Sequence, residues 1–298
     1  MKPIVLSYVL LTSLTFFVGC GGGSSKGPDL AAEKAKALKM SDPVARSHNL
    51  VTVADRQRKV GDVMGAKSTL SAAEDAAQTV EEPASKARSL VQIAASRLRG
   101  GDLVDGGNTL KQAEKAVDGI VDPAAKAEVL AEMAGAYQAE SPDKANYMLS
   151  QAKDEVEKVT DPEQKGLASV RVAAALVKAD KKEAAQTFID AAADLARPLE
   201  DMRRRADALA DAAILELKLD AEKGAALLTE AKAAADGADS PYTQAHAHLS
   251  IAKKLAAAGK KGDARTQADK SMDLSDKVGD SSLRSELKEQ INKLKESL

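Results

Sequence analysis

The chain has few side chains of the types that most often bind metals or act as nucleophiles: three histidines and one cysteine among 298 residues. His246 and His248 are two residues apart, and such positions on a helix point roughly 200 degrees apart, so they cannot bind one zinc ion together. His48 has no cysteine or acidic cluster beside it. Because Cys20 is the single cysteine, thiolate chemistry is not expected elsewhere. The sequence therefore predicts no catalytic residue, no metal site and no cofactor.

Charged residues are abundant but are not grouped as in enzymes or nucleic-acid-binding proteins. The 43 lysines and arginines nearly balance 45 aspartates and glutamates, which leaves no large basic face for nucleic acid. Arg203, Arg204 and Arg205 would point about 100 degrees apart on a helix. Asp201 and Asp207 flank them, so we expect a solvated face. Neither of the common glycine-rich phosphate-binding motifs is present. We predict that the protein is not an enzyme.

The segment from Met1 to Cys20 is typical of an export signal. A lysine at position 2 precedes an apolar stretch over residues 4–17, and small residues follow it. The run from Phe17 to Cys20, Phe-Val-Gly-Cys, resembles the lipobox of bacterial lipoproteins, although that family usually has leucine where Phe17 stands. The resemblance implies cleavage after residue 19 and attachment of acyl chains such as palmitate to Cys20. An ordinary secretory signal with an incidental cysteine is the alternative.

An acylated Cys20 would hold the protein on a membrane surface. The apolar stretch is shorter than the roughly 20 residues that a membrane-spanning helix needs. Glycines and serines follow the cysteine, so residues 20–29 are predicted to form a flexible tether. The expected location is the cell envelope, lipid-anchored, on the periplasmic side of the outer membrane.

The rest of the chain is built from copies of one pattern, with a period of about 40 residues. Prolines at 43, 83, 123, 162 and 241 begin successive copies. An apolar residue followed by alanine recurs at 53, 93, 133, 172, 212 and 251, and the residue three positions earlier is usually leucine, the spacing of a buried helical stripe. Small or polar residues eight positions later predict a short turn. The repeat therefore predicts a first helix, a turn and a second helix in each copy.

The second helix repeats a small, large, small pattern. Its expected interface residues are Ala66, Leu70 and Ala73; Gly106, Leu110 and Ala113; Ala145, Leu149 and Ala152; Ala184, Phe188 and Ala191; Gly224, Leu228 and Ala231; and, more weakly, Ala264, Ala268 and Ser271.

These spacings resemble the tetratricopeptide repeat family. In the first two copies Ala54 and Ala94 precede the first small residue of the second helix by 12 positions, as in that family. The resemblance implies an all-α fold: a right-handed α-α superhelix, or solenoid, of about six helix-turn-helix repeats over residues 30–280. The period is longer than the family's, which is about 34 residues, and tryptophan is absent, so a HEAT-like array stays open.

The segment 281–298 carries leucine and isoleucine at helical spacing. We expect it to form a helix that caps the last repeat, while a short coiled coil for dimerisation is the alternative. A second short helix is expected over residues 31–40, at the other end of the array.

Tetratricopeptide arrays bind proteins and peptides mainly along their first helices, which implies a partner-binding groove here. The positions assigned to it are Arg58, Arg88, Val91, Leu98, Arg99, Val177, Lys178, Leu217, Lys218 and Lys253, and His48, Val51, Asp55, Val170, Ile214 and Leu249 share the same face. The mixture of aliphatic and cationic groups suits a peptide with apolar anchors and acidic character. The aliphatic members could instead be interior.

The sequence thus predicts a lipid-anchored scaffold of the cell envelope that binds an unidentified protein or peptide. One alternative is a subunit of an outer-membrane protein assembly complex. A less favoured alternative is a helical enzyme acting on peptidoglycan, which would need an acidic residue in a sugar cleft lined by aromatic side chains. Only four aromatic residues follow position 20.

Overall fold

The computed structural model describes residues 29–138 and 140–298, and it is all-helical in that part of the chain. The signal, Cys20 and most of the tether predicted above lie outside the described residues. The helices are α1 (Leu30–Leu38), α2 (Pro43–Lys59), α3 (Val63–Gln78), α4 (Pro83–Arg99), α5 (Leu103–Val117), α6 (Pro123–Tyr137), α7 (Pro142–Glu157), α8 (Pro162–Lys178), α9 (Lys182–Ala196), α10 (Met202–Leu219), α11 (Ala221–Asp236), α12 (Pro241–Ala257), α13 (Lys261–Ser275) and α14 (Ser281–Ser297).

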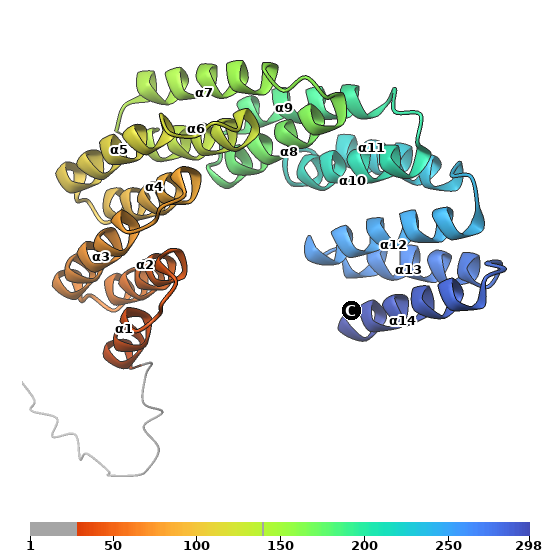
Figure 1. Ribbon diagram of the computed structural model, residues 1–298, viewed down its shortest axis with the longest axis horizontal. Coiled ribbons are helices and arrows are strands. Elements are labelled where there is room, and N and C mark those ends of the chain that lie inside the picture. Colours follow the sequence, from red (N-terminus) through yellow and green to blue (C-terminus); the bar gives the residue numbers. More distant parts are fainter. Residues whose placement is uncertain (1–28, 139) are drawn as a thin grey trace, which may run out of the picture.

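The helices pack as consecutive antiparallel pairs that form an arch (Figure 1). The pairs are α2–α3, α4–α5, α6–α7, α8–α9, α10–α11 and α12–α13, and they confirm the six predicted repeats. The first helices of successive pairs also contact one another, from α2 through α12. They line the inside of the arch, and α3, α5 and α7 lie on its outer side. A continuous inner face results.

Each first helix begins at a residue that caps it. In α2 the Asp42 carboxylate accepts hydrogen bonds from the amides of residues 44 and 45, and Pro43 occupies the first helical position. Asp122 and Glu82 cap α6 and α4 in the same way, and Asp161 caps α8 by accepting from the amide of Gln164. Proline at this position has no amide hydrogen to leave unpaired and its φ is already helical. The recurring prolines therefore mark the phase of the repeat.

The turn between the two helices of a pair needs a left-handed residue in four repeats. Gly61, Gly101 and Gly259 have φ of 86, 81 and 76 degrees, and Asp180 has φ of 56 degrees at the same place in the fourth repeat. Glycine adopts this region without a Cβ penalty, and aspartate tolerates it better than most residues. The left-handed conformation at this position explains why the sequence has a small or polar residue there.

The buried stripe of the first helices follows the predicted columns. Leu50, Leu90 and Ile93 are fully buried, as are the alanines that follow each apolar column position. The expected register of the second helix is wrong in α9, and in α7 the buried central residue is Met148 and the expected Leu149 is partly buried. In α9 the innermost residues are Ala185, Ile189 and Ala192, one position later than expected. The α8–α9 turn has three residues, as in the first two repeats, so Ala185 follows Ala173 by the same 12 positions; the expected series began one residue too early, and Phe188, although buried, is not the central residue.

A polar column crosses the buried side of the array. Gln57, Arg97, Tyr137 and Glu216 occupy equivalent places in four first helices. Gln57 accepts a hydrogen bond from Thr69 of its own pair. Tyr137 donates to Glu114 of the preceding pair, and Gln186 of the preceding pair donates to Glu216 over 2.8 Å. Buried polar groups need such partners, and the last two bonds join neighbouring repeats across the α5–α6 and α9–α10 boundaries.

Two single helices cover the ends of the array. At the C-terminal end α14 places Leu287 and Ile291 against Leu249 and Ala252 of α12 and Ala268 of α13. At the other end α1 lies against α2, and Ala37 is buried there. Terminal repeats of a solenoid otherwise expose the apolar faces that would pack on the next copy.

Candidate functional site

The inner face of the arch contains a hollow of about 340 Å³ that spans four consecutive first helices, α2, α4, α6 and α8. We call it the inner hollow. It is lined by His48, Val51, Thr52, Asp55, Val91, Gln92, Ala95, Arg99, Glu132, Gly135, Ala136, Ala175, Lys178 and Ala179.

Small and aliphatic side chains occupy much of the inner hollow. Val51 and Val91 are buried although they line it, and alanines follow them on the later helices. Gly135 allows α6 and α8 to approach closely, because a Cβ at this position would lie 2.5 Å from the Cβ of Ala179. An aliphatic surface of this kind offers contact area for apolar side chains of another molecule.

A carboxylate on α2 fixes one side of the inner hollow. Asp55 Oδ1 accepts hydrogen bonds from Arg58 Nη2 at 2.8 Å and from Ser96 Oγ at 2.6 Å. Its Oδ2 lies 3.3 Å from Arg99 Nη2. Arg58 also donates to the Ser96 carbonyl at 2.8 Å. The two arginines of this part of the predicted groove are therefore held by one carboxylate.

A second ion pair connects α4 to α6. Arg88 Nη2 lies 2.7 Å from Glu128 Oε2, and its Nε is 4.0 Å from Glu132 Oε1. Burial raises the pKa of Glu132, and the charge of Arg88 partly opposes this effect. The pairs between α2 and α4 and between α4 and α6 neutralise charges across the repeat boundaries, so the inner face is not a continuous basic stripe.

Lys178 differs from these arginines. It is exposed at the end of α8, lines the inner hollow, and makes no ion pair within 4.0 Å with any other described residue. Glu132 lines the same hollow; burial raises the pKa of this glutamate, and the charge of Lys178 opposes that effect. Its ammonium group is therefore available to a ligand.

The structure brings part of the predicted groove together. Val91, Arg99 and Lys178 line the inner hollow, and Arg58 and Arg88 adjoin it through their ion pairs. The other predicted positions do not line the inner hollow.

Leu98 and Leu217 face their own second helices instead of the groove. A Cβ on Gly106 would lie 2.6 Å from Leu98 Cδ2, and one on Gly224 would lie 2.7 Å from Leu217 Cγ. The small residue in each second helix makes room for the leucine, so both are packing residues and their assignment to an open groove needs correction. Val177 likewise packs on the core.

Two predicted lysines lie outside the inner hollow. Lys218 is exposed on α10, and Lys253 of α12 donates to Gln290 of α14 over 3.1 Å. The inner hollow therefore does not include the predicted positions on α10 and α12.

One sequence column that points to the inner face was missed, and a second was assigned only in part, because His48 and Arg88 were placed on this face and Glu128 was not. The missed column contains Thr52, Gln92 and Glu132, which all line the inner hollow and stand one repeat apart. The other begins with His48, whose Nδ1 is 3.1 Å from Gln92 Oε1, and continues with Arg88 and Glu128. The signal was present, because each column stands at a fixed offset from the buried apolar column, but its polar residue types vary.

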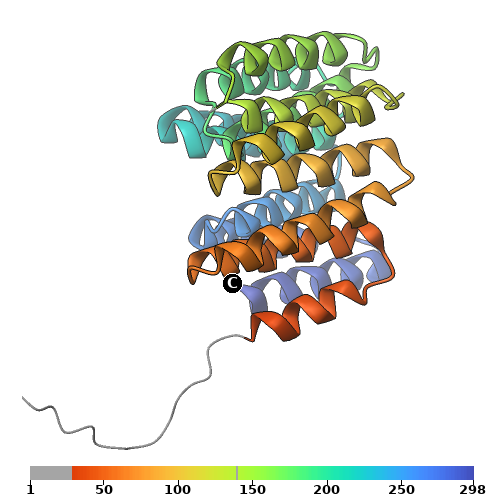
Figure 2. The same cartoon turned by 90° about the vertical axis from the view of Figure 1, so that its left-hand side faces the viewer.

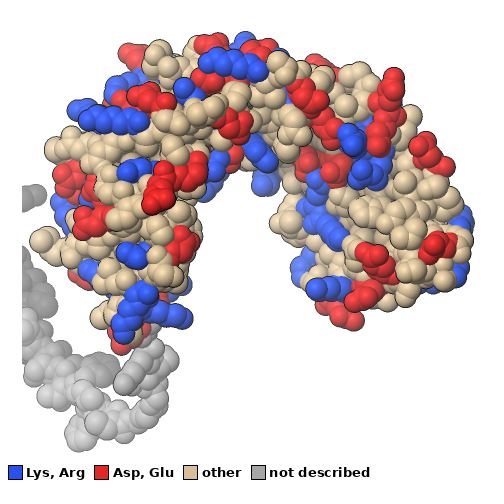
Figure 3. Space-filling model, viewed as in Figure 1, with Lys and Arg blue, Asp and Glu red and all other residues tan. Residues whose placement is uncertain are grey.

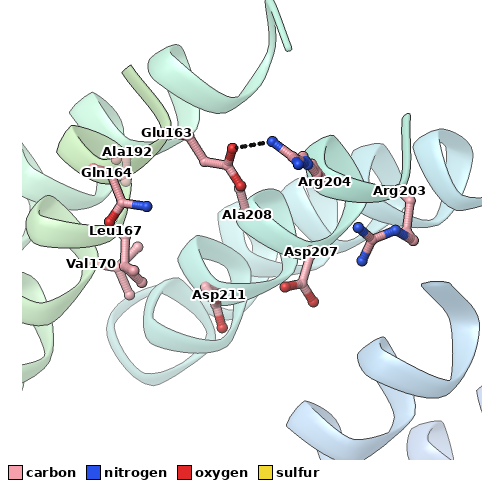
Figure 4. A pocket seen from close by; sticks show the side chains of 11 residues that line it. Glu163, Gln164, Leu167, Val170, Ala192, Arg203, Arg204, Asp207, Ala208 and Asp211 are labelled. Carbon is pink, nitrogen blue, oxygen red and sulfur yellow. Dashed lines mark hydrogen bonds and ion pairs between the residues drawn. The ribbon is translucent and has the colours of Figure 1, made fainter. Parts of the chain in front are cut away.

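A second hollow, of about 420 Å³, lies between α8 and α10 (Figure 4). Glu163 and Arg204 form an ion pair of 2.9 Å across it, and Asp207 and Asp211 project from α10. Lys254 of α12 lies 3.3 Å from Asp207 and 2.5 Å from Asp211. Burial raises the pKa of Asp211, with Lys254 opposing it. These contacts continue the series of charge pairs between first helices.

The histidines have structural surroundings. His248 is fully buried, with Nδ1 2.9 Å from Gln267 Oε1 and Nε2 2.9 Å from Asp236 Oδ1. His246 is partly buried, and burial together with the nearby Arg203 lowers its pKa. Within residues 29–138 and 140–298, no three histidine, aspartate or glutamate side chains are grouped to hold a metal ion.

Acidic and basic side chains are interspersed over the visible surface (Figure 3). Basic groups also reach into the space under the arch, near its top and along the inner edge of the limb formed by α10 to α14. The convex side shows both signs of charge.

Comparison with known proteins identifies no family. No family model matches the chain, and no curated protein matches it. Among solved structures, the crystal structure of Ton1535 from Thermococcus onnurineus NA1 is similar, with a TM-score of 0.47 and 18% identity over 87% of this chain and 94% of that chain. The crystal structure of BtubC (BKLC) from P. vanneervenii is similar with a TM-score of 0.36 and 15% identity, over 83% and 91%.

Proposed function

We propose that the protein is a lipid-anchored scaffold of the cell envelope that binds a protein or peptide segment along the inner face of its arch. The observation that carries the proposal is the inner hollow, which crosses four repeats and combines an aliphatic floor with polar groups at its margin. Such preformed grooves bind segments through a few apolar anchors and matched charges. Binding rather than catalysis is proposed, because the carboxylates Asp55 and Glu128 are engaged by arginines.

The chemistry of the inner hollow narrows the partner. Val51, Val91 and Ala175 would contact apolar side chains, while Lys178 would face an acidic group. Arg58, Arg88 and Arg99 already have carboxylate partners, so they contribute less attraction than their number suggests. We therefore propose a segment with aliphatic anchors and one acidic residue near α8, rather than a strongly acidic segment.

The anchor is proposed from the sequence, since Cys20 lies outside the described residues. Acylation contributes about 0.8 kcal/mol per buried methylene, and two or more chains give stable attachment. Among the described residues, no helix has both the length and the apolar character needed to cross a membrane. Changing Cys20 to Ser should move the protein from the membrane fraction to the soluble fraction with its helix content unchanged. Retention in the membrane fraction would reject the anchor.

Site-specific photocrosslinking in living cells tests the binding surface. A photoreactive amino acid replaces Thr52 or Gln92 in the inner hollow, and Lys111 or Lys153 on second helices serves as the matched control. We expect the first two positions to give the same discrete adducts, which mass spectrometry then identifies. Lys178→Glu in the same cells should weaken those adducts.

Two crosslinking results would contradict the proposal. Absence of adducts from the inner positions, or the same adducts from Lys111 and Lys153, would show that the inner face is not the binding surface. Reversal of Arg58 or Arg99 is a poor test, because a glutamate there would stand beside Asp55 and disturb the contact between α2 and α4. Lys178 can be reversed without breaking an ion pair among the described residues.

A further inference from the structure

Four aliphatic side chains are exposed at one edge of the first two repeats. Val63 and Met64 begin α3, and Leu103 and Val104 begin α5; their exposed fractions are 48%, 77%, 59% and 74%. We call these four residues the aliphatic edge. Val60, at the end of α2 beside them, is 68% exposed. None of the five is needed to fill the core.

The second of these two helix positions is acidic in the next three repeats and is glycine, Gly262, in the sixth. The second position of the helix is Asp143 in α7, Glu183 in α9 and Glu222 in α11. Acidic residues are favoured there because the first turn of a helix carries a partial positive charge. The partial positive charge does not stabilise an aliphatic side chain, so it does not explain the exposed Met64 and Val104 at these positions.

The two halves of the aliphatic edge are neighbours. Lys67 Nζ, in the first part of α3, lies 3.2 Å from the carboxylate of Asp102, which caps α5. The preceding turns project freely, since a Cβ on Gly61 or Gly101 would meet no atom within 4 Å. The four side chains therefore form one outward-facing group instead of two isolated exposures.

The described chain begins at this same edge. Helix α1 runs antiparallel to α2, because Glu33 near its start pairs with Arg56 near the end of α2 at 2.6 Å. Asp29 is one turn before Glu33, and Val60 is one turn after Arg56, so both lie toward the same side. In Figure 2, the left end of α1 is its beginning. The described chain thus begins, at Asp29, on the side of the array where the aliphatic edge lies.

We propose that the aliphatic edge inserts into the surface of the bilayer and fixes the orientation of the arch. The inference rests on the proposed lipid anchor, because the nine residue steps from Cys20 to Asp29 reach at most about 32 Å. Aliphatic side chains held this close to a membrane gain free energy by leaving water and entering its interfacial layer, to a depth of about 5–10 Å. The helices then stand end-on to the membrane, and the inner hollow opens sideways to partners.

Depth-dependent fluorescence quenching tests the proposal. The full processed chain is placed in vesicles of phosphatidylethanolamine and phosphatidylglycerol, with Met64→Cys or Val104→Cys carrying an environment-sensitive dye. Glu183→Cys and Glu222→Cys label the equivalent positions of later repeats and serve as controls. We expect a blue shift and quenching by spin-labelled lipid at 64 and 104, and neither effect at 183 and 222.

Different results separate this inference from the proposed anchor. The unsubstituted chain should take up no dye, because acylation occupies its single cysteine; dye uptake there would reject the anchor itself. If the chain stays on the vesicles but the dyes at 64 and 104 remain in water, the aliphatic edge does not insert. A blue shift that appears without vesicles and grows with protein concentration would indicate a second copy on the edge and would overturn the inference. Far-ultraviolet circular dichroism confirms that each variant is folded.

Discussion

Arg97 Nη1 lies 2.7 Å from Glu74 Oε2, and this ion pair joins α4 of the second repeat to α3 of the first. The arginine side chain is only 7% exposed, and it also donates a hydrogen bond to Thr109 of its own pair. A buried guanidinium is costly unless it is paired. The contact between these two repeats therefore depends on a charge supplied from the preceding second helix.

Removal of the acidic partner should destabilise the protein. Glu74→Ala leaves the Arg97 guanidinium buried without a counter-charge, and breaking a buried pair in this way costs about 3 kcal/mol. Asp75→Ala, an exposed carboxylate on the same helix, should cost under about 0.5 kcal/mol. Urea denaturation followed by circular dichroism measures both losses. Equal losses would mean that the ion pair contributes nothing beyond a surface charge.

The apolar seam gives a second stability prediction. Leu90 is fully buried in α4, and Leu90→Asp would place an unpaired carboxylate among apolar side chains at a cost of several kcal/mol, about 3 or more. Lys111→Asp on the exposed side of α5 changes the charge without touching the core, so its effect should stay within about 0.5 kcal/mol. Thermal melts of the two variants should differ clearly, and similar melting temperatures would contradict the register of the seam.

The sequence predicted the fold well because the solenoid repeats one local pattern. Proline-led helix starts and the columns at Leu50 and Val53 recur along the chain, and short-range packing between neighbours then determines the array. The shift to Ala185 was missed because alanine stands at 184, 185, 191, 192 and 193, so composition alone could not choose the buried side. The 12-residue spacing from the buried alanine of the first helix, here Ala173, selects Ala185 and was the signal that could have fixed the register.

The groove was predicted less accurately, for physical reasons. Leu98 and Leu217 have the residue type of a groove anchor, but each fills the space above a glycine in the neighbouring helix. Arg58 and Arg88 look like free cations in sequence, and only three-dimensional proximity reveals their partners Asp55 and Glu128. The regular period brings equivalent positions together, but it does not say which opposite charges will meet.

The backbone conformations of two glycines predict that a glycine-to-alanine change has opposite effects on stability at the two positions. Gly101 has φ of 81 degrees, where a Cβ costs about 1–2 kcal/mol, so Gly101→Ala should destabilise the protein by about 1 kcal/mol. Gly262 lies inside the first turn of α13 with open space around it, so Gly262→Ala should stabilise by about 0.5 kcal/mol. Both changes add one methyl group at an exposed site. Denaturation curves that shift in the same direction for both variants would argue against the left-handed turn.

The partly buried Glu132 predicts a pH dependence of stability. Burial raises its pKa, so the folded protein holds the proton more tightly than the unfolded chain does. This contribution is complete below the ordinary glutamate pKa of about 4.3 and is lost as the pH rises through the raised folded value. Glu132→Gln does not titrate, and Arg88 keeps Glu128 as its partner.

The glutamine variant should therefore gain stability relative to the unsubstituted protein as the pH rises from about 4 to 7, because it avoids burying a charge. The difference between the melting temperatures of the two proteins, measured at several pH values, gives this gap in stability. Glu81→Gln, an exposed control ahead of α4, should leave a small gap that does not vary in this way. A constant gap for Glu132→Gln, or one that narrows toward neutral pH, would show that the Arg88 charge outweighs burial at this position.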